Sequence, residues 1–264
     1  MVKKNRVDIL LFESGLVESR SMAQRLVMAG QVRANGQLVP KPATKVDINS
    51  KLTIDHGPRF VSRGGDKLEA AFENFHLDVV GLTCADVGAS TGGFTDCLLQ
   101  HGAAKVYAVD VGHGILHWKM RKHPRVVVME KTNARYVEML PEPIDFITID
   151  ASFISLKTLL PVIKGWGQLS QIVALIKPQF EAGRQEVARG KGVVRHPEIH
   201  RSVLMDLLSF MEQEEFGVQG LIRSPVLGPK GNTEFLVWLT QNMDHVALQG
   251  NALTIRINNI LDLE

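Results

Sequence analysis

Four charged residues stand at the ends of predicted strands or next to one. Asp150 and Lys177 each end an apolar run, Glu234 begins another, and Lys67 opens an amphipathic helix. Open α/β sheets collect ligands outside the carboxyl ends of their strands, so we expect these residues to meet there. A lysine held out of water beside a second cation can serve as a base or stabilise an anion, and carboxylates keep such lysines in register. The set suits methyl transfer to a ribose hydroxyl, which must lose its proton as it attacks.

Two structural alternatives for this set stay open. Lys177 could extend along apolar surface to reach water, and Asp150 could cap a helix that begins near residue 152. A metal ion is not required by this chemistry. The nine histidines, His113 and His117 among them, and the two cysteines are scattered along the sequence, so we predict no metal site.

Residues 84–110 have the pattern of a nucleotide-binding half-fold. An apolar run ending on Asp86 leads into a glycine-rich turn, then a helix-compatible stretch and a second apolar run that ends on Asp110. Glycines let the backbone approach a ligand, and a carboxylate about twenty residues on can accept ribose hydroxyls. A tight turn without a ligand is the alternative. Gly88 is followed by Gly92 and Gly93, which is not the spacing of a dinucleotide site.

The remainder of the chain predicts an α/β fold. Strands are expected at residues 84–86, 106–110, 126–129, 144–150, 172–177, 217–224 and 234–239, with helices between them, including one at 197–211. This alternation predicts a largely parallel, Rossmann-like sheet with helices on both faces. Residues 241–264 depart from that rhythm and form a C-terminal tail, with a helix expected at 252–263 and no assigned role.

The first 57 residues predict a separate small α+β domain. Helices are expected at 7–16 and 22–30, a hairpin around Asn35 and Gly36, and a strand at 51–54. Residues 1–67 hold 12 lysines and arginines against 6 acids, whereas the rest holds 18 against 22. The basic front end predicts polyanion binding. Glycine, proline and arginine at 58–65 predict a linker to a second domain at 66–240.

Composition narrows the class of protein. The chain has 264 residues, 45 % of them hydrophobic, a net charge of +2 and two cysteines. No apolar run is long enough to span a bilayer and no signal peptide is visible, so we expect a cytoplasmic protein without a disulfide framework. A monomer is favoured.

Residues 6–36 resemble the RNA-binding fold first described in ribosomal protein S-four. The resemblance rests on Arg-x-Asp-x-Leu-Leu from Arg6, Ser-Arg-Ser-x-Ala-x-x-Leu from Ser19 and Gly-x-Val-x-x-Asn-Gly from Gly30. The glycine-rich turn resembles the S-adenosylmethionine site of FtsJ-type RNA 2′-O-methyltransferases. With residues 62–68 (SRGGDKL), 149–156 (IDASFISL), 177–181 (KPQFE) and 231–235 (GNTEF), the chain is identified as similar to the TlyA family over about residues 5–239.

The resemblance implies an rRNA cytidine-2′-O-methyltransferase that acts on ribosomal RNA or ribosomal subunits. It implies a catalytic tetrad of Lys67, Asp150, Lys177 and Glu234. The S-adenosyl-L-methionine site would comprise Asp86, Gly88, Ala89, Ser90, Thr91, Gly92, Gly93, Asp110 and Asn133. RNA contacts are expected from Arg6, Arg20, Arg25, Arg63, Arg184, Arg189, Lys191 and Arg195, although the last four could belong to an ordinary solvated loop.

Two other functions stay open at this point. One is a membrane-active haemolysin, the activity behind an older name of the family. The other is an RNA-binding protein whose cofactor domain is catalytically idle. The sequence does not identify the modified nucleotide or choose between the ribosomal subunits.

Overall fold

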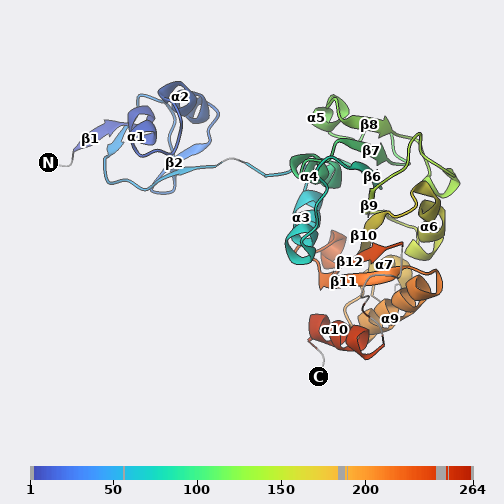
Figure 1. Ribbon diagram of the computed structural model, residues 1–264. Coiled ribbons are helices and arrows are strands. Elements are labelled where there is room, and N and C mark those ends of the chain that lie inside the picture. Colours follow the sequence, from blue (N-terminus) through green and yellow to red (C-terminus); the bar gives the residue numbers. More distant parts are fainter. Residues whose placement is uncertain are drawn as a thin grey trace. The chain divides into compact units, whose positions relative to one another are not determined.

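The chain forms two compact units, Met1–Arg59 and Phe60–Glu264. The computed structural model describes residues 3–55, 57–183, 188, 190–241, 248 and 250–262 (Figure 1). Each unit has its own apolar core.

The first unit packs two short helices against short strands. Its elements are β1 (Lys4–Arg6), α1 (Val7–Glu13), α2 (Arg20–Met28), β2 (Val32–Ala34), β3 (Gln37–Leu38), β4 (Lys45–Asp47) and β5 (Leu52–Ile54). The predicted hairpin is present, because Ala34 pairs with Gln37 across Asn35 and Gly36. Both turn residues have positive φ, 50° and 83°, as a two-residue hairpin loop requires. The strands β1 and β4 were not predicted; each has only three residues.

Asp8 is the buried charge of the first unit. Its carboxylate is fully buried and accepts hydrogen bonds from Arg6 and Arg20, each at 3.0 Å, and from Gln24 at 2.9 Å. These donors, led by Arg6, hold the pKa of Asp8 well below its usual range. Two arginines predicted to contact RNA therefore also satisfy a buried acid, and both remain partly exposed.

Replacing Asp8 by Asn should destabilise the first unit by about 2 kcal/mol at neutral pH, because hydrogen bonds to a charged acceptor are lost. The folded pKa of Asp8 lies below its unfolded value, so the stabilisation is present above about pH 4 and is lost on further acidification. All three tryptophans lie in the second unit. Amide hydrogen exchange of α1 and α2 in the full chain is therefore the suitable measurement. Asp47→Asn, which removes the charge from an acceptor of the exposed Asn49 amide, is the control. Equal protection in both variants would contradict the assignment.

The second unit is built on one seven-stranded sheet with the order β11-β12-β10-β9-β6-β7-β8. The strands are β6 (Thr83–Val87), β7 (Lys105–Val109), β8 (Val126–Met129), β9 (Phe146–Ile149), β10 (Gln171–Ile176), β11 (Gly217–Arg223) and β12 (Phe235–Thr240). All neighbours pair in parallel except β12, which is antiparallel to both β10 and β11. The predicted α/β fold with a largely parallel sheet is confirmed.

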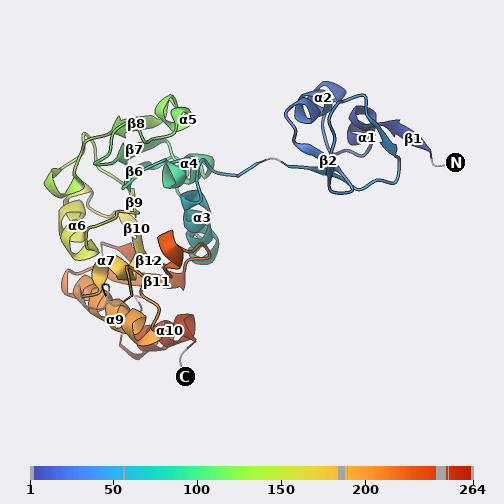
Figure 2. The same ribbon diagram turned by 180° about the vertical axis from the view of Figure 1, so that it is seen from behind.

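Helices cover both faces of this sheet (Figures 1 and 2). One face packs against α3 (Gly64–Phe75) and α4 (Gly93–Gln100), and the other against α6 (Leu156–Ile163), α9 (Pro197–Gln213) and α10 (Asn251–Leu261). Successive strand residues alternate between the two cores: Cys84 and Val106 belong to one, Ala85 and Tyr107 to the other. Burial on both faces explains why these strands appear in the sequence as continuous apolar runs. Short helices α5 (Trp118–Arg121), α7 (Pro178–Glu181), η1 (Ala134–Tyr136), η2 (Lys164–Trp166) and η3 (Pro229–Gly231) complete the unit.

Two predicted boundaries differ from the structure. The segment predicted as a linker at 58–65 is partly folded, since Phe60 is buried in the core and α3 already begins at Gly64. Gly65 fits against the Phe60 ring, where an added Cβ would lie 2.1 Å from Cγ. The tail after residue 240 contains α10, whose Leu253 and Ile257 are buried in the core of the second unit.

Among the described residues, no helix has the length and apolar character needed to cross a membrane.

Candidate active site

One edge of the sheet gathers the four predicted charged residues. Asp150 follows β9 and Lys177 follows β10, so both stand at carboxyl ends of parallel strands. Because β12 runs antiparallel to β10, its first residue, Phe235, pairs with Ile176 at the end of β10. Glu234 therefore lies at the same edge although it precedes its strand. The fourth member, Lys67, comes from the first turns of α3.

These four residues form two ion pairs. Lys67 Nζ lies 2.6 Å from Glu234 Oε2, and Lys177 Nζ lies 2.6 Å from Asp150 Oδ1. Lys177 also donates to the Ser152 hydroxyl at 3.0 Å and to the Asp150 carbonyl at 3.2 Å. Both lysines and Glu234 are buried, whereas the Asp150 side chain is 22 % exposed. Two cations and two anions are thus held largely out of water beside an opening to solvent.

The structure decides between the alternatives left open for this set. Lys177 does not extend to the surface, because its side chain is only 8 % exposed and its ammonium group is paired with Asp150. Asp150 does not cap α6. The N-cap of that helix is Ser155, whose hydroxyl accepts a hydrogen bond from the Lys157 amide. Neither structural alternative accounts for the two residues.

The glycine-rich turn brings its backbone against Asp150. Gly88 follows β6 with φ of 84°, and a Cβ added there would lie 2.8 Å from the Asp150 carbonyl oxygen and 2.9 Å from Ala151. Gly92 has φ of 93° and caps α4. At both positions only glycine avoids backbone strain. β6 lies between β7 and β9, so the turn stands where the strand order reverses, the usual ligand site of such sheets.

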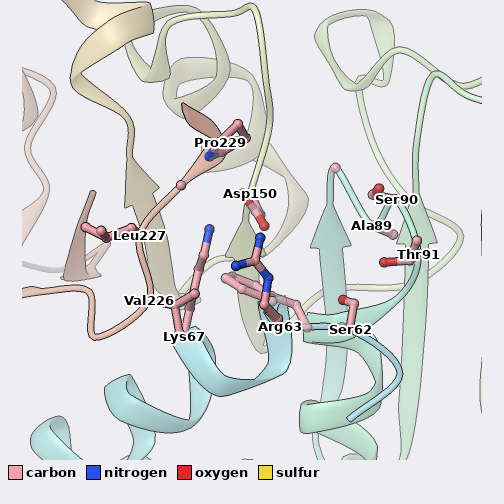
Figure 3. A pocket seen from close by; sticks show the side chains of 15 residues that line it. Ser62, Arg63, Lys67, Ala89, Ser90, Thr91, Asp150, Val226, Leu227 and Pro229 are labelled. Atoms are coloured by element: carbon pink, nitrogen blue, oxygen red, sulfur yellow. The ribbon is translucent and has the colours of Figure 1, made fainter. Parts of the chain in front are cut away.

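Two adjoining pockets meet at this turn. One, of about 230 Å³, is lined by residues that include Arg63, Lys67, Thr91, Asp150 and Gly228 (Figure 3). The other, of about 260 Å³, is lined by residues that include Asp110, Asn133 and Phe153. Gly88, Ser90 and Asp150 line both. The residues predicted for the two ends of a cofactor therefore surround one continuous region of the sheet edge.

Asp110 lines the second pocket and binds the backbone of the glycine-rich turn. Its two carboxylate oxygens accept hydrogen bonds from the backbone amides of Ser90 at 2.8 Å and Gly112 at 2.6 Å. Each oxygen has a second lone pair, so the carboxylate can still accept a ribose hydroxyl. Asn133 accepts a hydrogen bond from the Arg135 amide and caps η1. Both residues line the pocket that would hold the nucleoside.

Asp86 and Gly92 are the two residues predicted to contact a cofactor that line neither pocket. Asp86 also has its carboxylate inside the core. It is fully buried in β6, where Thr95 donates to one carboxylate oxygen at 2.6 Å and Thr148 to the other at 3.1 Å. Burial, with a smaller contribution from the Asp150 charge, raises the pKa of Asp86 to about 7. Asp86 ties β6 to α4 and β9 beneath the glycine turn.

The raised pKa of Asp86 predicts a pH-dependent stability. The unfolded chain releases this proton near pH 4 and the folded chain near pH 7, so stability falls as pH rises between these values and then levels off. Asn at position 86 cannot titrate. Between pH 5 and 7, the free energy of unfolding should therefore fall less in Asp86→Asn than in wild type, by on the order of 2 kcal/mol. Urea unfolding followed by tryptophan fluorescence measures it, with exposed Asp145→Asn as the control. Parallel pH profiles of wild type and Asp86→Asn would contradict the burial of a titrating carboxyl.

The predicted RNA-contacting residues fall into three groups. Arg6, Arg20 and Arg25 belong to the first unit, and Arg25 is exposed. In the second unit, Arg63 is exposed and lines the pocket of about 230 Å³, while Lys191 and Arg195 are exposed on the segment before α9. Arg184 and Arg189 lie outside the described residues.

Three residues of the site did not stand out individually in the sequence. Gly228 packs on Glu234, since an added Cβ would lie 2.0 Å from Oε1. Asn232 is only 2 % exposed. It accepts a hydrogen bond from the Val194 amide and donates to the carbonyls of Gly192 and Pro229, so it joins the segment before α9 to the segment before Glu234. Phe153 is 90 % exposed with a left-handed φ of 64° and contacts Phe180 at a ring separation of 4.9 Å. All three lie in segments already quoted for the family resemblance or next to them, which is the only signal the sequence offered.

Comparisons with known proteins identify the families that the two units resemble. The model of the FtsJ-like methyltransferase family matches residues 60–241, and that of the S4 domain matches residues 5–52. A putative rRNA methyltransferase of Bacillus subtilis, YqxC, is 49 % identical over 90 % of this chain and 86 % of its own. The 16S/23S rRNA (cytidine-2′-O)-methyltransferase TlyA of Mycobacterium tuberculosis is 43 % identical over 92 % of each chain. The solved structure of a putative hemolysin from Streptococcus thermophilus is 43 % identical with a TM-score of 0.72 and covers 99 % of this chain and 96 % of that one.

The fold and its site therefore define an FtsJ-like methyltransferase domain preceded by an S4 domain. Within that class, the chain belongs to the TlyA family, as the resemblance predicted.

Proposed function

We propose that this protein transfers the methyl group of S-adenosyl-L-methionine to the ribose 2′-hydroxyl of a cytidine in ribosomal RNA, in the cytoplasm. The observation that carries the proposal is the meeting of Lys67, Asp150, Lys177 and Glu234 as two ion pairs beside the glycine turn. A relative at 43 % identity is named for this reaction on 16S and 23S rRNA. That name supports the substrate class.

The residues present fit the cofactor. Gly88 leaves a cradle against Asp150 and Ala151 that a Cβ would fill. Ser90, Thr91, Gly92 and Gly93 would hold the methionine part, while Asp110 and Asn133 would hold the ribose and adenine in the adjoining pocket. When bound, S-adenosyl-L-methionine supplies a methyl group on a positively charged sulfur, which leaves as a neutral thioether.

The tetrad then has two tasks. Asp150, which lines both pockets and is paired with Lys177, would orient the 2′-hydroxyl so that its attack on the methyl donor is in line with the leaving group. The oxygen–carbon bond forms, and the hydroxyl proton passes to the lysine–carboxylate set and from there to solvent. Glu234 holds Lys67 in the pocket, so a cation faces the oxygen as negative charge develops on it. The two lysines and two carboxylates carry no net charge together, so the tetrad is buried as a neutral set.

Phe153 suits the base of the target nucleotide. Its ring is largely exposed despite the contact with Phe180, its backbone has a left-handed φ, and it lies three residues after Asp150. RNA bases that leave a stack commonly rest on aromatic rings. Phe153, at the rim of the second pocket, would hold the base, while Arg63, which lines the first pocket, would contact a phosphate. The S4 domain would supply most of the remaining affinity for structured RNA.

Phe153→Ala should weaken RNA substrate binding by about 1–3 kcal/mol, the usual value of one base–aromatic stack. The expected sign is a higher KM for RNA. Because Phe153 also lines the pocket assigned to the cofactor's nucleoside, the affinity for S-adenosyl-L-methionine is measured separately. Steady-state kinetics at saturating cofactor measure the KM for RNA, and Phe153→Tyr, which keeps the ring, should stay close to the wild-type KM. A wild-type KM for Phe153→Ala would remove this residue from the substrate site.

The proposed function is tested by incubating the full chain with methyl-labelled S-adenosyl-L-methionine and either ribosomal subunit. Label should appear in rRNA and survive as 2′-O-methylcytidine after complete digestion to nucleosides. Cofactor binding without label in either subunit would instead favour an RNA-binding protein with an idle cofactor domain. Leakage of liposomes caused by wild type and Lys177→Ala alike would favour a membrane-active haemolysin, in keeping with the name of the Streptococcus thermophilus protein.

A further inference from the structure

A second cluster of chemically capable side chains lies between α3 and α4, outside the site described above. Glu69 comes from α3, Cys97 from α4, and His101 caps the carboxyl end of α4. Glu69 Oε2 lies 2.8 Å from His101 Nε2 and 3.6 Å from Cys97 Sγ. The three ligand-type atoms all lie within 4.8 Å of one another. Cys97 and His101 are four residues apart, which places them on the same face of the helix.

These separations are close to those of a tetrahedral metal site. Zinc bonds of about 2.3 Å to sulfur and about 2.1 Å to oxygen place the two ligand atoms about 3.5 Å apart. The Cys97–Glu69 separation is 3.6 Å. The zinc geometry also needs about 3.3 Å between nitrogen and oxygen, so the 2.8 Å between His101 and Glu69 must open slightly.

The charge and surroundings of the cluster also suit a divalent cation. A Cys97 thiolate, a Glu69 carboxylate and a neutral His101 imidazole together balance two positive charges, which matters because Cys97 is fully buried. The His101 ring is stacked on Phe72 at 3.9 Å between centroids, so its orientation is fixed. Glu69 also lines a surface pocket together with Asp66, Glu73 and Arg223.

We propose that Glu69, Cys97 and His101 bind a borderline-soft divalent cation such as Zn²⁺, with water as the fourth ligand. The site is structural: it ties α4, which begins at the glycine turn, to α3, which carries Lys67 two residues before Glu69. It departs from the sequence-based expectation that no metal is bound, and it leaves the methyl-transfer chemistry metal-free. It does not depend on the proposed function.

The test uses Co²⁺ as a spectroscopic probe of the full, untagged chain. One equivalent should bind, with the intense visible bands of tetrahedral cobalt and the near-ultraviolet charge transfer of a cobalt–thiolate bond, and Zn²⁺ should displace it. Cys97→Ala should lose the charge-transfer band, and Glu69→Gln, which keeps shape and size, should weaken binding at least about tenfold. Cys84→Ala, which removes the other buried thiol, is the matched control and should bind as wild type does.

A second measurement keeps the proposal testable if Cys97→Ala fails to fold. Added Zn²⁺ should raise the melting temperature of metal-stripped wild type, because a ligand bound only by the folded state stabilises it. Glu69→Gln should show a smaller rise. The proposal is overturned if stripped wild type takes up no cobalt and shows no shift with zinc. It is also overturned if Glu69→Gln and Cys97→Ala bind as wild type does, or if the thiolate band is lost in Cys84→Ala instead.

Discussion

Lys177→Ala is expected to lower the rate of methyl transfer about 10³-fold while the affinity for S-adenosyl-L-methionine changes less than about twofold. The Lys177 ammonium group lies 2.6 Å from Asp150 and 3.0 Å from Ser152, at the end of β10. It does not line either pocket directly, so its loss should spare cofactor binding. The loss should also be tolerated by the fold, because the remaining Asp150 side chain is 22 % exposed and can be hydrated. Single-turnover transfer to rRNA measures the rate, and calorimetry measures cofactor affinity.

Two further variants make this result specific. Lys157→Ala removes a lysine on α6 that is paired with Asp206 at 2.8 Å near the surface, and it should leave the rate unchanged. Lys177→Arg keeps the charge but replaces a compact ammonium by a planar guanidinium, so it should also be slow. Transfer by Lys177→Ala at the wild-type rate would remove the tetrad from the mechanism. A lost melting transition in that variant would instead point to a structural role.

Gly88→Ala is expected to reduce cofactor affinity at least about 100-fold, the largest binding effect that the structure predicts. An added Cβ would meet the Asp150 carbonyl oxygen at 2.8 Å and Ala151 at 2.9 Å, and both atoms belong to backbone that cannot swing aside. Residue 88 also needs φ of 84°. The turn must therefore shift, which moves the amides that would face the cofactor. A shift of about 1 Å at such a site can cost about two orders of magnitude.

Gly114→Ala separates this clash from general backbone strain. Gly114 has φ of 75° but nothing within 4 Å of an added Cβ, so it carries the same conformational cost in open space. Calorimetric titration with S-adenosyl-L-methionine should show wild-type affinity for Gly114→Ala and little binding for Gly88→Ala. Equal affinities in the two variants would show that the glycine turn does not hold the cofactor.

Much of the site could be predicted because strand ends are visible in a sequence. Asp110, Asp150 and Lys177 each end an apolar run, and the carboxyl ends of parallel strands share one edge. The place of Glu234 could not be predicted in this way, because Glu234 begins an apolar run and does not end one. Its place at this edge depends on β12 running antiparallel, which the apolar pattern does not encode. The family motifs supplied that missing step.

Other features depend on contacts between segments that are distant in the sequence. Asp86 was predicted to touch the cofactor, but its carboxylate is turned into the core toward Thr95 and Thr148. Asp8 gains two of its three partners, Arg20 and Gln24, from α2, and Glu69 meets Cys97 and His101 only because α3 packs on α4. A single sequence contains no signal for such pairs beyond the residue types themselves. The left-handed conformation of Phe153 is likewise invisible, because no glycine marks it.

Whether this tetrad methylates a ribose hydroxyl of ribosomal RNA can be tested in cells by a map of 2′-O-methyl groups on rRNA. The map would compare cells that lack the protein with the same cells given back the wild type, Lys177→Ala or Lys157→Ala. We predict at least one 2′-O-methylcytidine that is absent without the protein, is restored by wild type and by Lys157→Ala, and is not restored by Lys177→Ala. Identical maps in all four strains, or restoration by Lys177→Ala, would show that the tetrad does not carry out this reaction.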